Sequence, residues 1–337
     1  MNPISATPSV RNHQRGLAMD RRLALRAGAA MVLSLWSLRG AADGSPNGEA
    51  ATPQPVPQGI SVTSKAVGPL QLEVLRAQPA ARGRAFPPLL LIPGAYHGAW
   101  AFEDKLMPFL AARGFDVYAM SLRGHGASGG AELVDNASFD DYVSDVLTVM
   151  AELPDAPVLI GHSLGGLLAR RVAEQATVRA VVLMASPTPR SMRQAAVRLL
   201  ARFPLPMIRF MVTGNPDHVY RNSDVLRGLL FGGVRQPDVD TAIQRMLAER
   251  ESRRIVTDVQ SLEFRPSLVP LLAIGGDADI GVPVSALEEA AALHGGSVKV
   301  LAGAAHEFFL MHGWQGAATC IDGWLQRVAG LMSHTSG

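Results

Sequence analysis

The stretch PVLIGHSLGG, residues 157–166, decides the fold of this 337-residue chain. An apolar run ends in a serine enclosed by glycines, and a sequence rich in leucine and alanine follows. This order predicts a buried strand, a sharp turn and a helix, the context of a G-x-S-x-G nucleophile elbow. Such a turn lifts the serine hydroxyl out of the sheet, and glycines are required where strand and helix nearly touch. We predict that Ser163 is a nucleophile; a glycine turn without catalysis is the alternative.

A second match to the same pattern, GASGG at residues 126–130, serves as an internal control. Its serine, Ser128, has glycines on both sides, and no helical sequence begins behind it. The strand, turn and helix that an elbow requires are therefore not predicted there. We interpret Ser128 as a loop residue.

Strand and helix patterns alternate on both sides of the elbow. Continuous apolar strands that alternate with helices indicate a parallel sheet covered on both faces. The first two predicted strands, ISVTS and LQLEVLRA, are expected to form an antiparallel pair. We predict an α/β fold with a mostly parallel, doubly wound sheet of about eight strands, formed by residues 59–187 and 264–337.

Between these two parts the strand pattern stops. Residues 188–263 contain helical patterns with apolar faces and many arginines. We predict that they form a helical cap, or lid, inserted over the edge of the sheet. Ordinary crossover helices between strands are the alternative.

Residues 1–42 have the layout of an export signal. A basic stretch, residues 19–26, precedes a mainly apolar segment of twelve residues, 27–38, and then small residues suited to cleavage. A spanning helix needs about 20 apolar residues, so no stable membrane anchor is expected, and anchoring by an uncleaved signal is less favoured. We expect export to the periplasm or the medium, and the paired arginines loosely resemble a twin-arginine signal. Residues 43–58, rich in proline and glycine, are predicted to be a linker.

Composition excludes several classes of function. The net charge is only +2, and six arginines with a single aspartate lie within residues 1–42, so no nucleic-acid surface is expected. The one cysteine, Cys320, cannot form an internal disulfide. Neither metal-ligand spacing nor a glycine-rich phosphate loop occurs, so we expect no metal and no cofactor. The oligomeric state is left open.

A serine nucleophile needs a base to take its proton and an acid to orient that base. His306 follows the last predicted strand, and Asp279 follows the strand before it. Open α/β sheets place their ligands at the carboxyl ends of strands. The order Ser163, Asp279, His306 is also the order of an α/β-hydrolase triad. Asp277, two residues earlier, is the alternative acid.

Four segments occur in the expected order along the chain, LLLIPGAYHGAW, SLRGHGAS, GHSLGG and GGDADIGVP. With them the chain resembles the α/β-hydrolase superfamily from about residue 59 to residue 330. The resemblance implies that Asp279 rather than Asp277 is the acid. It also implies an oxyanion hole made by the backbone amides of Ala95 and Leu164. The family often has His-Gly where this chain has Pro93-Gly94, which bears on the shape of that loop.

The predicted reaction is hydrolysis of a small to medium apolar carboxylic ester through an acyl-enzyme. Tyr96, His97 and Phe309 are expected to line the substrate pocket. Related lyases carry lysine where this chain has Glu307, which favours hydrolysis. Lactone, thioester or carbon–carbon cleavage and perhydrolysis by the same triad stay open. So does a binding protein that senses a ligand on a hydrolase scaffold.

Overall fold

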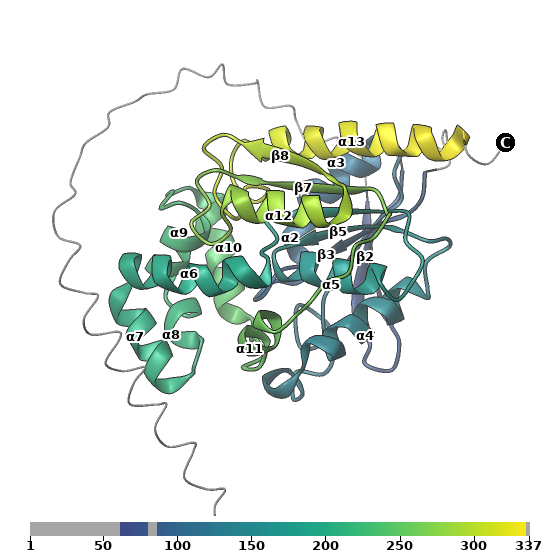
Figure 1. The fold of residues 1–337 in the computed structure, drawn as a ribbon. Coiled ribbons are helices and arrows are strands. Elements are labelled where there is room, and N and C mark those ends of the chain that lie inside the picture. The colour runs from purple at the N-terminus through teal and green to yellow at the C-terminus, as the bar shows by residue number, and fades with distance from the viewer. Residues whose placement is uncertain (1–60, 80–85, 335–337) are drawn as a thin grey trace, which may run out of the picture. The chain divides into compact units, whose positions relative to one another are not determined.

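The computed structural model describes residues 61–79 and 86–334. The predicted export signal, residues 1–42, and the predicted linker, residues 43–58, lie outside this part of the chain. The fold is built around one sheet (Figure 1).

The sheet has eight strands in the order β1-β2-β4-β3-β5-β6-β7-β8. Strand β2 is antiparallel to both of its neighbours, β1 and β4, and every other pair of adjacent strands in the sheet is parallel. This confirms the mostly parallel sheet of eight strands and its antiparallel opening pair. The strand bounds are β1 Val62–Val67, β2 Leu72–Ala77, β3 Leu89–Ile92, β4 Val117–Met120, β5 Val158–His162, β6 Ala180–Met184, β7 Leu271–Gly276 and β8 Ser297–Leu301.

Helices cover both faces because successive strand side chains point to opposite sides. Leu159 of β5 packs into one core, while its neighbours Val158 and Ile160 pack into the other. The covering helices of one face are α4 (Phe139–Met150), α5 (Leu164–Ala173) and α12 (Val284–His294), and those of the other are α2 (Trp100–Glu103), α3 (Leu106–Ala112) and α13 (Trp314–His334).

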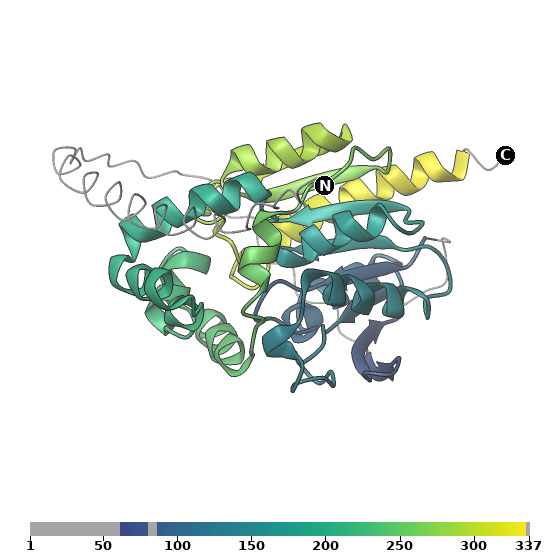
Figure 2. The ribbon, with the colours of Figure 1, turned by 60° about the horizontal axis from the view of Figure 1, so that its bottom comes forward.

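Six helices follow one another between β6 and β7, and we call them the α6–α11 segment. Figure 2 shows them grouped beside the sheet in teal and green. Thr188 begins the segment with a capping box, and Pro189 stands in the first turn of α6. The helices are α6 (Pro189–Arg202), α7 (Pro204–Thr213), α8 (Asp217–Tyr220), α9 (Ser223–Leu230), α10 (Pro237–Ala248) and α11 (Ile255–Gln260).

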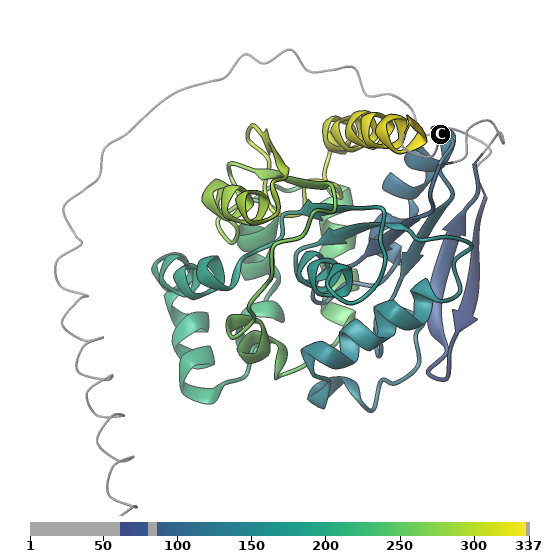
Figure 3. The ribbon, with the colours of Figure 1, turned by 45° about the vertical axis from the view of Figure 1, so that its right-hand side comes forward.

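A cavity lies between this segment and the carboxyl ends of the parallel strands. Its lining combines loop residues that follow β3, β5, β6, β7 and β8 with side chains of the α6–α11 segment. In Figure 3 the segment flanks the sheet on the side away from β1 and β2. Within residues 61–79 and 86–334, no helix combines the length and apolarity that crossing a bilayer demands.

Candidate active site

Ser163 occupies a strained turn between β5 and α5. Its backbone has φ +50° and ψ −114°, a conformation that residues with a side chain rarely adopt. The strain is held by close packing of the strand against the helix. A Cβ added to Gly161 would lie 2.2 Å from the carbonyl oxygen of Gly165, and one added to Gly165 would lie 2.2 Å from that of Ile92. Only glycine fits at either position, as the sequence predicts.

Ser128, the internal control, is tied into the loop after β4. Its hydroxyl donates to the carbonyl of Ser121 and accepts the backbone N–H of Glu73, both at 2.8 Å. The side chain is buried and fully engaged, so it holds the loop in place. The loop interpretation of Ser128 is confirmed.

Asp279 and His306 form a short buried contact. The Nδ1 atom of His306 lies 2.6 Å from Oδ2 of Asp279, and the backbone N–H groups of Gly281 and Val282 donate to Oδ1. These bonds fix the carboxylate and leave Nε2 of His306 facing away from it. Asp277 is exposed and accepts the N–H of Gly303 instead. Geometry therefore pairs the histidine with Asp279.

The surroundings of His306 favour its protonated form. Burial alone lowers the pKa of the imidazole, but the Asp279 carboxylate outweighs this effect and raises the pKa to about 9. His162, the neighbour of Ser163, behaves differently, because burial lowers its pKa well below the usual value. It packs against the rings of His306 and Phe309 as a neutral side chain. This agrees with a packing role for His162.

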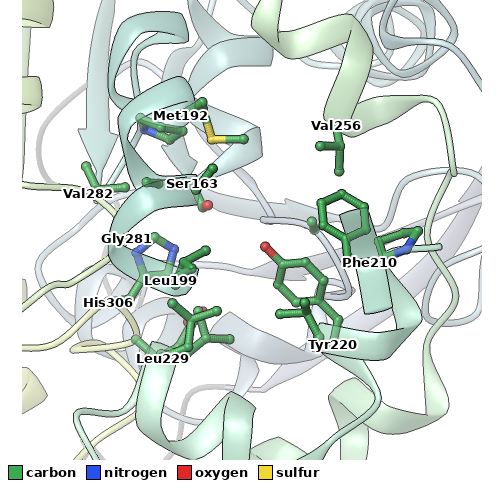
Figure 4. Close-up of a pocket in the computed structure, with 18 of the residues that line it drawn as sticks. Ser163, Met192, Leu199, Phe210, Tyr220, Leu229, Val256, Gly281, Val282 and His306 are labelled. Carbon is green, nitrogen blue, oxygen red and sulfur yellow. The ribbon is translucent and has the colours of Figure 1, made fainter. Parts of the chain in front are cut away.

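Ser163 and His306 line the same cavity. Figure 4 shows the Ser163 hydroxyl and the His306 ring facing a common space. Among the described residues, no hydrogen bond within 3.5 Å joins the hydroxyl to the imidazole. Catalytic hydrogen bonds are often long in ligand-free enzymes and tighten when a substrate binds.

Ala95 and Leu164, whose backbone amides are the expected oxyanion donors, line a cavity together with Ser163. Leu164 is the first residue of α5, where the helix dipole places partial positive charge, and Ala95 lies in the loop after β3. In the described part of the chain, no hydrogen bond occupies the N–H of either residue. Both groups are thus free to donate to an anionic oxygen.

Glu251, which no sequence pattern indicates, holds the loop that carries Ala95. Tyr96 has φ +60°, and its N–H donates to Oε2 of Glu251 at 3.3 Å. The other carboxylate oxygen, Oε1, accepts the Tyr142 hydroxyl at 2.6 Å and the backbone N–H of Ser252 at 2.7 Å. His125 Nε2 lies 3.5 Å from Oε2. Burial raises the pKa of Glu251, but His125 and these donors outweigh it, so the net shift is downward and the carboxylate stays ionised.

Glu249, two residues before Glu251, likewise accepts hydrogen bonds from the loops after β3 and β4. Its carboxylate accepts the indole N–H of Trp100 at 2.9 Å and the backbone N–H of Gly126 at 3.1 Å. The connection between α10 and α11 is therefore hydrogen-bonded to the loops after β3 and β4. No local sequence pattern signals these contacts, because the partners are more than 100 positions apart.

Two cavities meet at Ser163, one of about 150 Å³ and one of about 90 Å³. His97 lines the larger cavity and Tyr96 the smaller one. Phe309 is not in the lining of either; it is buried against Phe102 and His162. The shared lining is Ala95, Ser163, Pro187, Met192, Pro216, Tyr220 and Val256.

Tyr220 is the one side chain of this shared lining that can donate a hydrogen bond opposite Ser163. Figure 4 shows its hydroxyl directed into the cavity toward Ser163, with Phe210 behind it. The ring stacks on Tyr96 with centroids 5.0 Å apart. Burial raises the pKa of Tyr220, so the hydroxyl keeps its proton. No pattern in the sequence singles out this residue.

Three buried polar side chains, one of them the candidate base His306, form a cluster. His162, His306 and Glu307 each offer a ligand atom within 4.8 Å of the others, so they could hold a metal ion. Their sequence spacing is not that of a metal motif, and the fold alone brings them together. An ion bound there through Nε2 of His306 would occupy the lone pair that a general base needs. Burial raises the pKa of Glu307, which favours its neutral form.

Comparison with known proteins gives one family and several related folds. A model of an alpha/beta hydrolase family matches residues 89–317. A pyrethroid hydrolase of Sphingobium wenxiniae is 38% identical over 80 residues, which are 23% of this chain and 27% of that enzyme. The matched stretch thus spans about a quarter of this relative's length.

Solved structures resemble the chain over most of its length. An esterase from Rhodococcus sp. ECU1013 has 20% identity and a TM-score of 0.58, covering 80% of this chain and 100% of that one. A proline iminopeptidase from Mycobacterium smegmatis has 19% identity and a TM-score of 0.62, covering 81% and 100%. At these identities the likeness establishes the fold alone.

Proposed function

This protein belongs to the α/β-hydrolase family, and we propose that it hydrolyses carboxylic esters through an acyl-enzyme intermediate on Ser163. One observation carries the proposal. Ser163, held at φ +50° at the end of β5, opens into the same cavity as His306, whose Nδ1 lies 2.6 Å from Asp279. Nucleophile, base and orienting acid are the groups that acyl transfer requires.

In the first half of the reaction, Ser163 Oγ attacks the ester carbonyl while Nε2 of His306 takes the hydroxyl proton. Asp279 stabilises the resulting imidazolium through its bond to Nδ1. The carbonyl oxygen becomes an oxyanion and accepts the free N–H groups of Ala95 and Leu164. The imidazolium then protonates the leaving alcohol as the carbon–oxygen bond breaks, which leaves the acyl group on Ser163.

In the second half, water replaces the alcohol. Nε2 of His306 takes a proton from the water as it attacks the acyl carbon, and the same pair of amides holds the second oxyanion. Collapse of this intermediate returns the proton to Ser163 Oγ and releases the carboxylic acid. The Tyr220 hydroxyl is placed to donate to a substrate oxygen on the opposite side of the cavity.

The cavity lining favours small to medium apolar substrates. Leu199, Met207 and Phe210 of the α6–α11 segment contribute apolar surface, and we assign residues 188–263 the role of a cap over the site. The second cavity beside Ser163 provides room for another substituent of the same ester. A substrate with an apolar acyl group and an apolar alcohol fits this arrangement.

Turnover of a series of p-nitrophenyl esters with increasing acyl length tests the proposal, with a pyrethroid ester included because one relative is named for that activity. We expect multiple turnovers by the wild type and a loss of at least about 10³-fold in Ser163→Ala. Ser163→Ala should unfold at an unchanged temperature. Binding of these esters with no turnover would instead favour a ligand sensor.

A further inference from the structure

The outward face of helix α7 exposes a stripe of apolar side chains. Leu205, Ile208, Met211 and Val212 recur at helical spacing, and together with Val197 of α6 they are between 51% and 80% exposed. Scattered exposed apolar residues need no explanation, but a continuous group of them marks an interaction site.

Helices α6 and α7 are strongly basic. They carry five arginines, and no acidic residue occurs between Glu174 and Asp217. In the part of the chain that the structure describes, the arginine–carboxylate ion pairs all involve other arginines. Arg198 is half-buried and donates to the carbonyls of Ile280 and Gly281, whereas the remaining four are exposed. Among the described residues, therefore, no carboxylate neutralises the positive charge on this surface.

The inner face of α7 already has a role, because Met207 and Phe210 line the cavity of Ser163. Leu205, Ile208 and Val212 lie on the opposite side of the helix, and none of the exposed apolar side chains, Met211 included, lines that cavity. Figure 1 shows α6 and α7 on the outside of the α6–α11 segment, away from β2. We define the α6–α7 outer surface as Arg190, Arg193, Val197, Arg202, Leu205, Ile208, Arg209, Met211 and Val212.

We propose that the α6–α7 outer surface binds the surface of an anionic phospholipid membrane. A helix with an apolar stripe flanked by arginines lies in the plane of the interface, with its apolar side chains below the headgroups and its cations beside phosphates. The charge favours this occupant over a second copy of the chain, since two copies would bring like charges together. The proposal does not depend on the proposed hydrolysis.

A site-specific fluorescent probe tests the contact in the full chain. Ile208→Cys in a Cys320→Ser background, labelled with an environment-sensitive dye, should shift to the blue with phosphatidylglycerol vesicles. The shift should be absent with phosphatidylcholine vesicles and should reverse at high salt. A matched probe at Leu268→Cys, in the exposed loop before β7, should not shift. Residues 27–38 of the full chain are also mainly apolar, so vesicle binding by the chain does not by itself locate the contact. The difference between the probes at positions 208 and 268 locates it.

Charge and apolar variants complete the test. Arg202→Gln and Arg209→Gln should each weaken binding to phosphatidylglycerol vesicles about fivefold, and Arg265→Gln should leave it unchanged. Leu205→Ser with Val212→Ser should weaken it further, with unchanged thermal unfolding. Equal shifts at positions 208 and 268, or no shift at either, would overturn the proposal. A shift at 208 that follows protein concentration without vesicles would show self-association instead.

Discussion

Glu251 accepts the backbone N–H of Tyr96 at 3.3 Å, although the two residues are 155 positions apart in the chain. The bond holds the peptide that joins Ala95 to Tyr96, whose backbone is left-handed. We expect Glu251 to influence in this way the direction of the Ala95 amide, one donor of the proposed oxyanion hole.

Glu251→Gln is expected to reduce kcat for ester hydrolysis about 10- to 100-fold, because a displaced oxyanion donor stabilises the transition state less. KM should change little. Affinity for a trifluoromethyl ketone, which forms an oxyanion on the enzyme, should fall in parallel with kcat/KM. Glu249→Gln is the matched control, since its contacts avoid Tyr96. Equal losses in both variants, with lowered unfolding temperatures, would indicate a structural role only.

The pH profile of kcat/KM should reflect the raised pKa of His306. Only the neutral imidazole accepts a proton, so activity should be lost as the pH falls through a midpoint near 9, well above the ordinary value of 6.5. Asp279→Asn removes the charge that raises this pKa. It should shift the midpoint downward and reduce kcat about 10⁴-fold. A midpoint unchanged by this substitution would contradict the assignment.

Tyr220→Phe removes a hydroxyl that faces Ser163 and leaves the ring stacked on Tyr96. If the hydroxyl donates to the substrate in the transition state, kcat should fall about tenfold at nearly constant KM. Steady-state kinetics on one soluble ester measures this difference. A rise in KM alone would mean that the hydroxyl serves ground-state binding.

Gly165→Ala tests the packing that holds the elbow. The added methyl would lie 2.2 Å from the Ile92 carbonyl oxygen, so we expect a loss of about 3 kcal/mol or more in the free energy of unfolding. Gly316→Ala is the control, since a Cβ in that part of α13 meets nothing within 4 Å. Chemical denaturation should show it unchanged or up to about 1 kcal/mol more stable. A stable Gly165→Ala protein would refute the steric argument.

Local sequence patterns are sufficient to predict the sheet and the nucleophile elbow at Ser163. Alternating apolar strands and helices predicted the eight-stranded, mostly parallel sheet, and the glycines around Ser163 predicted its turn. Asp279 and His306 could be found because parallel strands end at a common edge, so residues distant in sequence are brought together by a simple rule.

The contacts of the α6–α11 segment follow no such rule. Tyr220 of α8 and Glu251, in the connection between α10 and α11, are brought to the site by the packing of the whole segment, and no sequence pattern around either residue indicates this. The expectation that Phe309 lines the pocket is wrong, because its ring stacks in the core against Phe102. An aromatic residue near a predicted site carries no signal of which way it points.

Fluorophosphonate labelling followed by peptide mapping tests the identity of the nucleophile most directly. The reagent reacts with an activated serine, and we predict a single adduct on Ser163 that is lost in Ser163→Ala. Ser128, whose hydroxyl is engaged on both sides, should remain unlabelled. An adduct on a residue other than Ser163, or persistent labelling of a folded Ser163→Ala protein, would contradict the account.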